Sequence, residues 1–540
     1  MAAKRILILG GGFAGIYVAR RLEATLRPEE ATIQLVNQEN YWVYQPMLPE
    51  VISGSIGLTD IVSPIRHLCP RTQLIMREVE NIDLARKVVT VSPGFRPRAL
   101  ELAYDYLVIA LGGVTNFYGM PGMIEHGKPF RTLADALALR NHLIHVLEEA
   151  DVETDSELRK KLLTFVVAGG GFSGVELMAE MNDFIHRVKR SYPRLKDEAV
   201  RCVLVHPKDH ILPEMDQRLA IFAEGILTKR GVEILANDRV TAATSEKAVL
   251  KSGKEIPTKT LASTVPSAMP PVLDRLDCVK EKGRLLANSQ LELSGHEGVV
   301  WTVGDCAAVK TVAGNPVPPT AQHATRAAEL AADNIVAAMR GGAAKGFAFE
   351  GLGKLASLGH FSAIADIMGV RVSGFPAWVL WRTIYLMKMP GLNRKVRIGL
   401  DWLVALLFPP DLVQIKAVRE SGIVRQYFDA GETIFHQGDL GDNVYVIEKG
   451  QCEVLRDVNG VEQFVADLGP GDYFGEIAVL GNLTRGATVK AATAMHVLLI
   501  PRGDFHLLKA SVPAFGAVFE NLATKRAAEN AQSPAEPRIK

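Results

Sequence analysis

Two periodicities of apolar and polar positions alternate along the N-terminal part of the chain. Residues 5–22 form a short continuous apolar run, then a glycine cluster, then apolar positions at helical spacing, and residues 164–181 repeat this design. A second apolar run follows each unit, at residues 32–36 and 201–205. A buried strand, a helix and another buried strand fit each unit. The pattern therefore predicts an α/β fold with two β-α-β units, one in each of two Rossmann-like domains.

Glycines occupy equivalent places in the two units, directly after the first strand and at the start of the helix. They are Gly10, Gly12 and Gly15 in the first unit and Gly169, Gly171 and Gly174 in the second. Such glycines permit a tight turn and let the backbone approach a pyrophosphate, which the helix N-terminus binds. One loop of this kind is also explained by an ordinary glycine turn, but two in the same context indicate two dinucleotide sites.

The end of the second strand in each unit departs from the usual pattern. An Asp or Glu normally accepts ribose hydroxyls there, whereas this chain has Asn37 in the first unit and His206 in the second. The Asn37 side chain still has an acceptor oxygen. At His206 no carboxylate repels a 2′-phosphate, and Lys208 could pair with one, so the residues leave NADPH open as an alternative to NADH.

Composition excludes several classes of protein. The chain has 540 residues, a formal net charge of +1, and 48% apolar residues, so it is long enough for several domains and has no global affinity for nucleic acid. Its five cysteines are scattered, without a close pair or metal-like spacing (Cys69, Cys202, Cys278, Cys306 and Cys452). We therefore expect a reducing compartment, with no disulfide framework and no metal site.

Two further strand-like segments carry a family resemblance. Residues 104–112 end in Gly112, and residues 299–305 end in Gly304-Asp305. With the two glycine loops, this set resembles the two-dinucleotide-binding-domain flavoproteins. The resemblance implies FAD on the first loop, the nicotinamide nucleotide on the second, and contact of Asp305 with the FAD ribityl chain. It also makes NADH the preferred reductant.

Residues 318–326, PPTAQHATR, resemble the A-Q-x-A-x-Q segment of type II (non-proton-pumping) NADH:quinone oxidoreductases. The resemblance implies that Gln322 donates to a quinone carbonyl near the flavin. Arg326 replaces the family's second glutamine and can also donate to a carbonyl. An ordinary polar helix start is the alternative explanation. Since no close cysteine pair is present, disulfide reductases and sulfide:quinone enzymes are disfavoured.

The same resemblance extends over roughly residues 1–415. It places Gln45 and Pro46 beside the flavin and Glu176 in the nicotinamide pocket. It also includes residues 374–378, GFPAW, which are close to the family's G-F-x-A-W.

Residues 372–408 hold two apolar stretches that are too short to span a membrane. Basic residues (Arg382, Lys388, Arg394, Lys395 and Arg397) and aromatic residues (Trp378, Trp381, Tyr385 and Trp402) are interleaved between them. Such helices suit an anionic headgroup region. We therefore predict a helical membrane-docking segment and a cytoplasmic protein that is peripheral to the membrane. A homodimer interface or an ordinary core helix pair is the alternative.

After residue 422 the chain changes to short β-like runs separated by glycine turns, which predicts a small β-barrel. The turns are at Gly431, Gly438, Gly450, Gly471 and Gly475. Residues 474–489, FGEIAVLGNLTRGATV, resemble the phosphate-binding cassette of cyclic-nucleotide-binding domains. The cassette residues proposed to contact the ligand are Gly475, Glu476, Ile477, Arg485, Gly486 and Ala487.

In that family, Arg485 would neutralise the cyclic phosphate and Glu476 would accept from the ribose hydroxyl. Gly486 lacks the hydroxyl that favours cGMP, so cAMP is expected. A degenerate barrel without ligand is the alternative. Because the barrel closely follows the membrane segment, its ligand is expected to alter membrane docking or quinone access.

The expected domains are FAD-binding (1–115 and 295–346), NAD(P)H-binding (116–294), membrane docking or dimerisation (347–420) and cyclic-nucleotide binding (421–525), with a disordered tail at 526–540. The function expected from the resemblance is FAD-dependent electron transfer from NADH to a membrane quinone under cyclic-nucleotide control. Two alternatives stay open, a cyclic-nucleotide-responsive redox sensor with low turnover and an NADPH-dependent reductase of a soluble electron carrier.

Overall fold

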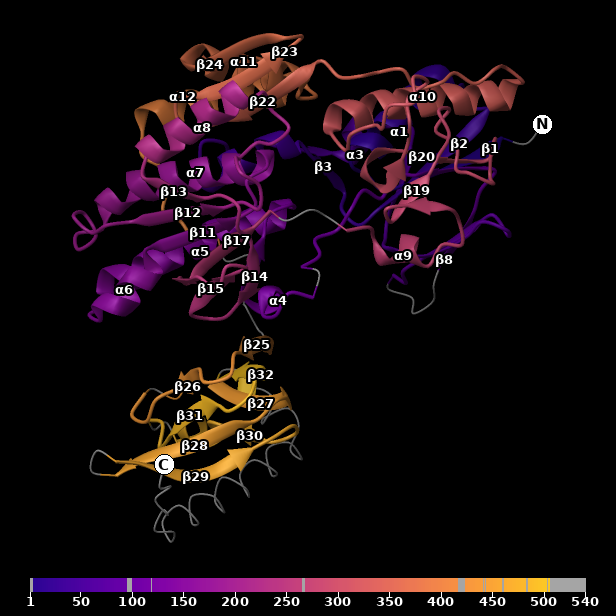
Figure 1. Cartoon of the computed structure of the whole chain (residues 1–540). Helices are drawn as coiled ribbons and strands as arrows, with labels where there is room; N and C mark the ends of the chain where they lie inside the picture. The colour runs from indigo at the N-terminus through magenta and orange to yellow at the C-terminus, as the bar shows by residue number, and fades with distance from the viewer. Residues whose placement is uncertain are drawn as a thin grey trace.

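The computed structural model describes residues 3–94, 100–117, 119–264, 268–415, 423–439, 441, 443–458, 461–481, 484–502 and 504–505. Figure 1 shows two α/β domains side by side, a small layer of strands and helices above the left-hand one, and a β domain below. The predicted tail at 526–540 lies outside the described residues.

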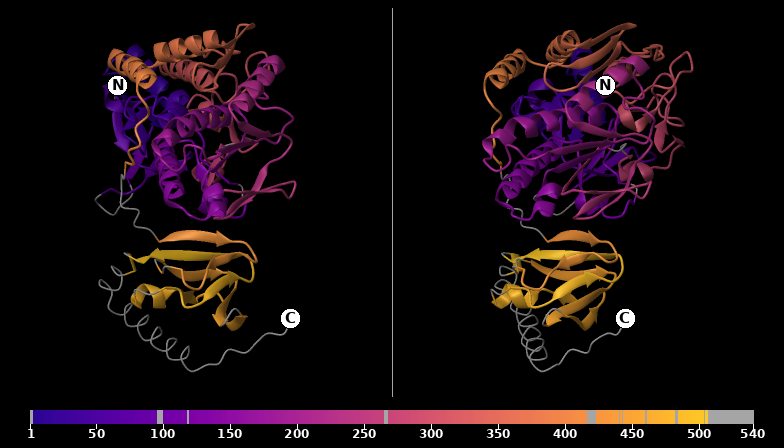
Figure 2. Two further views of the ribbon diagram at one scale, coloured as in Figure 1. Left: turned by 90° about the vertical axis from the view of Figure 1, so that its left-hand side faces the viewer. Right: turned by 60° about the vertical axis from the view of Figure 1, so that its left-hand side comes forward.

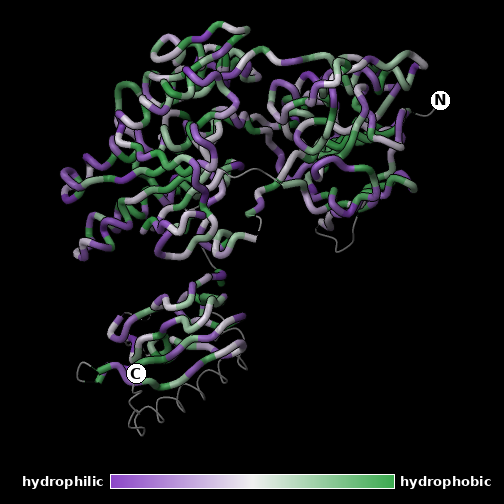
Figure 3. Tube along the Cα trace, viewed as in Figure 1, coloured by the Kyte–Doolittle hydropathy of each residue, from purple (hydrophilic) through white to green (hydrophobic). Residues whose placement is uncertain are grey.

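The first domain is built on a five-stranded parallel sheet in the order β20-β9-β1-β2-β5 (Val300–Thr302, Tyr106–Ile109, Lys4–Leu9, Ala31–Asn37 and Gln73–Met76). Its strands are apolar because both faces are covered, as the hydropathy colours of Figure 3 show. Helices α1 (Phe13–Thr25) and α10 (Ala321–Arg340) pack together on one face. The antiparallel strands β6, β7 and β8 (Val79–Asp83, Val88–Val91 and Leu100–Ala103) contribute to the core on the other.

The second domain repeats this design with the parallel order β10-β17-β11-β12-β13 (Gly127–Pro129, Thr260–Ser263, Thr164–Ala168, Arg201–Val205 and Val232–Leu235). Helices α5 (Leu133–Val152) and α7 (Phe172–Val188) contribute to the core on one face. The antiparallel strands β14, β15 and β16 (Val240–Ala243, Lys247–Leu250 and Glu255–Pro257) contribute on the other. Both predicted β-α-β units are therefore present.

The predicted boundary at residue 294 between these domains is too late. Helix α9 (Pro271–Asp274) places Leu273 in the core of the first domain, and β19 (Arg284–Leu286) pairs with β21 (Ala307–Ala308). The crossing between the domains therefore precedes α9. Composition did not reveal it because these residues are as apolar as those of either domain.

The segment predicted to be a helical membrane-docking region is helical only in its second half. Strands β22, β23 and β24 (Gly353–Ser357, Ala363–Ile367 and Val370–Gly374) form an antiparallel sheet before α11 (Phe375–Lys388) and α12 (Leu392–Leu407). A Met368-Gly369 turn with positive φ at both residues joins β23 to β24. Among the described residues, no helix combines the length and the apolarity that a membrane crossing requires.

A buried ion pair joins α11 to α2 (Leu48–Ser53). Glu50 lies on α2, which packs between α5 and α7, and its Oε1 is 3.1 Å from the guanidinium of Arg382. The Trp402 indole donates to the other carboxylate oxygen at 3.2 Å. Arg382 lies over the rings of Trp378 and Trp402, at 4.2 and 4.4 Å. The Arg382 charge thus has one carboxylate and two aromatic rings as partners.

The C-terminal domain consists of two four-stranded antiparallel sheets. Their orders are β25-β32-β27-β30 (Val424–Phe428, Met495–Pro501, Asn443–Lys449 and Tyr473–Phe474) and β26-β31-β28-β29 (Thr433–Phe435, Thr488–Ala491, Cys452–Val458 and Val461–Leu468). Both sheets contribute to one core. All five predicted turn glycines have φ between +86° and +93°, which only glycine adopts at little cost.

Replacement of Arg382 by Ala should lower the free energy of unfolding by about 3–5 kcal/mol, because the Glu50 carboxylate then stays buried without its counter-ion. Thermal unfolding followed by circular dichroism measures this. The double variant Glu50→Gln/Arg382→Met, which removes both charges, should recover most of the loss. Arg397→Ala is the control, since that side chain is 54% exposed. Equal melting temperatures for Arg382→Ala and the control would contradict the structural role of the pair.

Candidate active site

The first glycine loop has the shape that a dinucleotide requires. A side chain at Gly15 would collide with the carbonyl of Gly10, whereas one at Gly12 would meet nothing within 4 Å. Gly12 precedes α1, whose first turn has no side-chain cap. The loop therefore leaves open space and backbone N–H groups where a pyrophosphate would lie. This cradle fits FAD.

The second loop has the same geometry. A side chain at Gly174 would collide with the carbonyl of Gly169, and one at Gly171 would again meet nothing within 4 Å. Helix α7 also begins without a side-chain cap. Both predicted loops are therefore built for close helix–strand packing and for an anionic ligand.

The side chains of Asn37 and His206 each accept a hydrogen bond from the glycine loop of their own β-α-β unit. The Gly11 N–H donates to Asn37 Oδ1 at 2.7 Å, and the Gly170 N–H donates to His206 Nδ1 at 3.0 Å. Burial, with a smaller effect of the nearby Lys208 ammonium, lowers the pKa of His206. A neutral imidazole with an accepting Nδ1 fits this environment. Lys208 is exposed and stands beside the loop.

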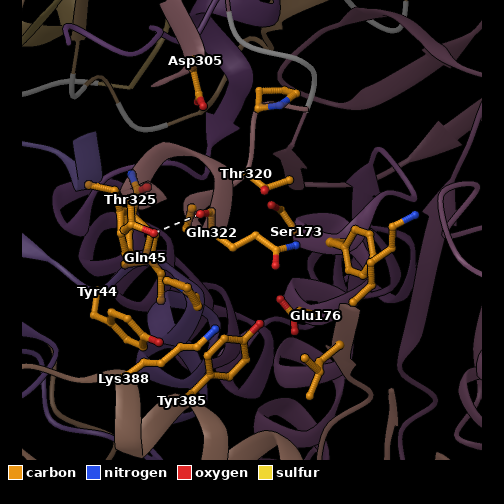
Figure 4. Close-up of a pocket in the computed structure, with 18 of the residues that line it drawn as sticks. Tyr44, Gln45, Ser173, Glu176, Asp305, Thr320, Gln322, Thr325, Tyr385 and Lys388 are labelled. Carbon is orange, nitrogen blue, oxygen red and sulfur yellow. Dashed lines mark hydrogen bonds between the residues drawn. The ribbon is translucent and has the colours of Figure 1, made fainter. Parts of the chain in front are cut away.

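A cavity of about 650 Å³ lies between the two loops and under α11. Figure 4 shows side chains from both domains and from α11 facing it. Asp305 and Arg131 lie on its wall, 3.7 Å apart. Gly112, which ends the strand before the domain crossing, has φ +64° and leaves open space at its Cα.

Glu176 lies on α7 at the floor of this cavity, with its carboxyl facing the Tyr385 hydroxyl (Figure 4). Its Oε1 accepts from the Ser357 N–H at 2.8 Å. Burial raises the pKa of the Glu176 carboxyl to about 8. The carboxyl is therefore neutral near pH 7 and keeps a proton that it can donate.

Glu180, one turn further along α7, is also buried, but it is outside the cavity lining. Burial, strengthened by the Glu50 charge, raises the pKa of this carboxyl to about 8 as well. Neither Glu180 nor the Glu50–Arg382 ion pair was predicted from the sequence. The i, i+4 spacing of Glu176 and Glu180 on α7 was the only sign of this second carboxyl.

Gln322 lines the cavity, but its amide already has backbone partners. Its Nε2 donates to the Gly353 carbonyl at 3.1 Å, and its Oε1 accepts from the Leu352 N–H at 3.0 Å. The amide carries two hydrogens and one is used here. Gln322 therefore also fixes the chain that leads into β22.

Two cations stand at the edge of the cavity. Arg326 pairs with Glu329 at 3.2 Å and lies 5.8 Å over the Phe349 ring. Desolvation and, secondarily, the Arg326 charge lower the pKa of the Lys388 ammonium. Lys388 was considered in the sequence only as a headgroup ligand, because nothing in the spacing of α11 shows that its last turn reaches the cavity.

Gln45 and Pro46 lie on the cavity wall, as expected, at the short 3₁₀ turn Gln45–Met47. The neighbouring Tyr44 ring packs against Tyr385 with the centroids 6.1 Å apart. Burial raises the pKa of both hydroxyls, so both are protonated. These two tyrosines close the side of the cavity nearest α11.

In the C-terminal domain the predicted cassette begins at Gly475 and continues into α13 (Glu476–Gly481), which contains Ile477. Glu476 and Arg485 are buried, whereas Gly486 and Ala487 follow on a more open turn. Arg485 donates to the carbonyls of Gly475 and Asn443, both at 2.8 Å, and lies 4.2 Å from the Phe435 ring centre. Asn482 and Leu483 of the cassette lie outside the described residues.

Comparison with known proteins agrees with this geometry. The model of the pyridine nucleotide-disulphide oxidoreductases matches residues 4–328, so the chain belongs to that family. Models of the NDH2 C-terminal domain and of the cyclic nucleotide-binding domain match residues 352–411 and 425–511. Within the family, the chain is a type II NADH dehydrogenase-like oxidoreductase that carries a cyclic nucleotide-binding domain, as the sequence analysis predicted.

Individual relatives cover about three quarters of the chain. Demethylphylloquinone reductase NdbB of Synechocystis is 31% identical over 74% of this chain and 96% of its own length. Type II NADH:quinone oxidoreductase Ndh of Mycobacterium tuberculosis is 29% identical over 75% and 88%. The structure of NDH2 from Plasmodium falciparum in complex with NADH shares the fold, with a TM-score of 0.69, 18% identity, and coverage of 76% and 99%.

Replacement of Glu180 by Gln should stabilise the protein increasingly as pH rises from about 5 to 8. The unfolded carboxyl ionises near 4.5 and the folded one near 8, so between these values the parent loses about 1.4 kcal/mol of stability per pH unit. Glutamine has no such proton, and the difference should level off above pH 8. Thermal unfolding across this range measures it, with the exposed Glu157→Gln as the control. Parallel curves for parent and Glu180→Gln would contradict a neutral buried carboxyl.

Proposed function

We propose that this chain transfers electrons from NADH to a membrane quinone, with FAD as its resident cofactor. The observation that carries the proposal is one cavity that is lined by the first helical residue after each glycine loop, Phe13 and Phe172, and by Glu176, whose pKa is raised to about 8 by burial. The bound flavin would supply the hydride-accepting and electron-donating chemistry that links a nicotinamide to a quinone. The residues that would hold it are the Gly10–Gly15 loop, Gly112 and Asp305.

The residues around the cavity suit a reaction that consumes protons. Reduction of a quinone by NADH takes up one proton from solvent besides the hydride. Glu176 would hold a proton at its carboxyl oxygen, beside the Tyr385 hydroxyl. Both tyrosines stay protonated and exclude water from the α11 side.

At the quinone end, Lys388 and Arg326 supply positive charge at the edge of the cavity. Developing negative charge on a quinone oxygen is stabilised by such groups. The second amide hydrogen of Gln322 can donate to the same oxygen, while the first keeps the side chain oriented.

For the reductant, we propose NADH over NADPH. His206 is neutral and its Nδ1 holds the Gly170 N–H, so the buried imidazole offers no positive charge to a 2′-phosphate. Lys208 alone would then have to pair with that phosphate from an exposed position, where an ion pair contributes little.

Oxidation of NADH with a soluble short-chain quinone tests this function in the FAD-loaded protein. We expect turnover with kcat/KM higher for NADH than for NADPH, and a decrease of kcat as pH rises through about 8, where Glu176 loses its proton. Glu176→Gln should lower kcat about 100-fold and abolish that decrease. Glu180→Gln, a buried carboxyl outside the cavity, should keep the parent kcat. Flavin reduction without turnover would instead support the redox-sensor alternative.

We also propose that α11 and α12 attach the enzyme to the cytoplasmic face of a membrane, through apolar contacts rather than through headgroup charges. The tryptophans predicted to reach the headgroups, Trp378, Trp381 and Trp402, are buried. Arg382 pairs with Glu50, and Arg394 and Arg397 pair with Asp60. The basic and aromatic residues of the segment are therefore largely used inside the protein.

Large apolar side chains are exposed on this segment instead. On α12 they recur at helical spacing, and β23–β24 and α11 add others; we call this set the docking face (Met368, Val370, Phe375, Val379, Met387, Leu392, Val396, Leu400, Leu403 and Leu407). An apolar surface of this extent on one end of a protein fits insertion into the interfacial region of a bilayer, where a quinone is found.

Co-sedimentation with phospholipid vesicles tests the docking face. The parent should bind zwitterionic as well as anionic vesicles, and binding should persist in high salt. Leu400→Asp/Leu403→Asp should lower the bound fraction about tenfold or more, because both side chains are more than half exposed and would carry charge into the bilayer. Val152→Asp, at an equally exposed position on α5, should bind as the parent does. Binding that requires anionic lipid and low salt would favour the headgroup model.

For the C-terminal domain we propose cAMP as the ligand, bound at Gly475, Glu476, Ile477, Arg485, Gly486 and Ala487. The buried Arg485 and Glu476 lie together at α13, where a cyclic phosphate and a ribose hydroxyl could replace protein partners. The open turn at Gly486 offers no side chain to discriminate in favour of guanine.

A further inference from the structure

The C-terminal domain touches the nicotinamide-binding domain directly. The Nε2 of His126, in α4 (Met123–His126), is 2.9 Å from the Tyr427 carbonyl and 3.4 Å from the Tyr427 N–H. Glu125 is 3.3 Å from the ring of His496 in β32. Burial lowers the pKa of His126, so the imidazole is neutral and its Nε2–H donates to the carbonyl.

The segment that receives this contact is one of the two chain crossings between the parallel-sheet domains. The crossing between β9 and α4 is described at residues 112–117 and 119–122, and Val114 pairs with Ala268 of the returning chain through two backbone hydrogen bonds of 2.8 and 2.9 Å. The end of the crossing is packed tightly. A side chain at Gly122 would collide with the Ala243 carbonyl and come within 2.8 Å of the Tyr427 ring.

A short route connects the cyclic-nucleotide cassette to this contact. Arg485 holds the carbonyl of Asn443 at the first residue of β27. Strand β27 pairs along β32 as far as His496, and His496 is the register partner of Tyr427 in β25. Withdrawal of Arg485 towards a cyclic phosphate would therefore release the start of β27, the strand that pairs with β32 and, at its far end, with His496; β32 in turn pairs with β25, which carries Tyr427.

The same domain is separated from the docking face. Figures 1 and 2 place α11, α12 and β22–β24 at one end of the molecule and the C-terminal domain at the other, in all three views. The described part of the intervening chain, up to Ile415, is fixed to α5, because Arg140 donates to the Asp411 carbonyl and Asn141 bonds to both the N–H and the carbonyl of Ile415. The expectation that the ligand acts on membrane docking, drawn from adjacency in sequence, does not fit this arrangement.

We propose that the cyclic nucleotide regulates the nicotinamide side of the reaction, through the contact of Tyr427 and His496 with α4 and the 112–122 crossing. This inference rests on the proposed function, since it assigns the step that the ligand controls. The crossing sets how the nicotinamide-binding domain faces the first domain, so a shift at α4 changes NADH affinity. The quinone edge and the docking face stay unaffected.

Paired calorimetric titrations of the full FAD-loaded chain test the proposal. NAD⁺ is titrated with and without saturating cAMP, and cAMP with and without saturating NAD⁺. By thermodynamic linkage, cAMP should change the dissociation constant of NAD⁺ by the same factor by which NAD⁺ changes that of cAMP. We expect this linkage factor to be about tenfold. Deuterium uptake at residues 114–126 should change with cAMP, and uptake at 375–407 should not.

The variant His126→Leu removes the hydrogen bond to Tyr427 while keeping a side chain of similar size. It should bind NAD⁺ and cAMP separately as the parent does, with a linkage factor near one. His145→Leu, an exposed histidine on α5 away from the interface, should keep the parent factor.

Three results would overturn the proposal. If cAMP binds but leaves NAD⁺ affinity unchanged and instead alters the KM for quinone or binding to vesicles, the route is wrong while the proposed function stands. An unchanged linkage factor in His126→Leu would also exclude this route, and the proposed function would again stand. If the full chain binds no cyclic nucleotide, the ligand assignment in the proposed function fails, and this inference with it.

Discussion

The two chain crossings between the parallel-sheet domains, paired at Val114 and Ala268, are the constraint on which the rest of the arrangement depends. They leave the carboxyl ends of β1 and β11 facing one cavity, so that each glycine loop presents its uncapped helix N-terminus to the same space. Helix α2 then packs between α5 and α7, and α11 covers the cavity from above. The two nucleotide-binding loops, which have the same construction, therefore lie at the two ends of a single site.

Burial raises the pKa of three carboxyl groups, Glu50 on α2 and Glu176 and Glu180 on α7, but their partners differ. Glu50 faces the Arg382 guanidinium and the Trp402 indole, so its charge is compensated where it lies. Among the described residues, Glu176 and Glu180 form no ion pair. The Arg382 charge lowers the pKa of Glu180 only slightly, and desolvation keeps both carboxyls protonated. One arginine therefore separates a structural carboxylate from a neutral acid in the cavity.

The parts of the fold that were predictable from sequence are those in which one residue type has one geometric use. Gly15 and Gly174 touch backbone that excludes any side chain, and the five turn glycines of the C-terminal domain have left-handed φ. Residues whose role depends on which way a helix faces were not predictable. Trp378 and Trp402 suggested a membrane surface but pack around Arg382, while leucines of α12 are exposed, and Lys388 reaches the cavity from the last turn of α11. The β22–β24 sheet was missed; its strands have five residues each and are bounded by glycines, at the start of β22, between β23 and β24, and at the end of β24.

The position of the C-terminal domain limits both where its ligand can act and how strongly. A domain biases only the elements that it touches, and a ligand shifts an equilibrium by no more than its differential interaction with the two states. The interface here contains the hydrogen bond at His126, the Glu125–His496 contact and the packing of Tyr427 on Gly122. Contacts of this kind contribute about 1 kcal/mol each, which corresponds to about a tenfold change in an equilibrium constant for one or two of them. An interface of this strength suits a graded change in NADH affinity. A complete on–off switch would need a difference of about 5.5 kcal/mol between the binding free energies of the ligand for the two states.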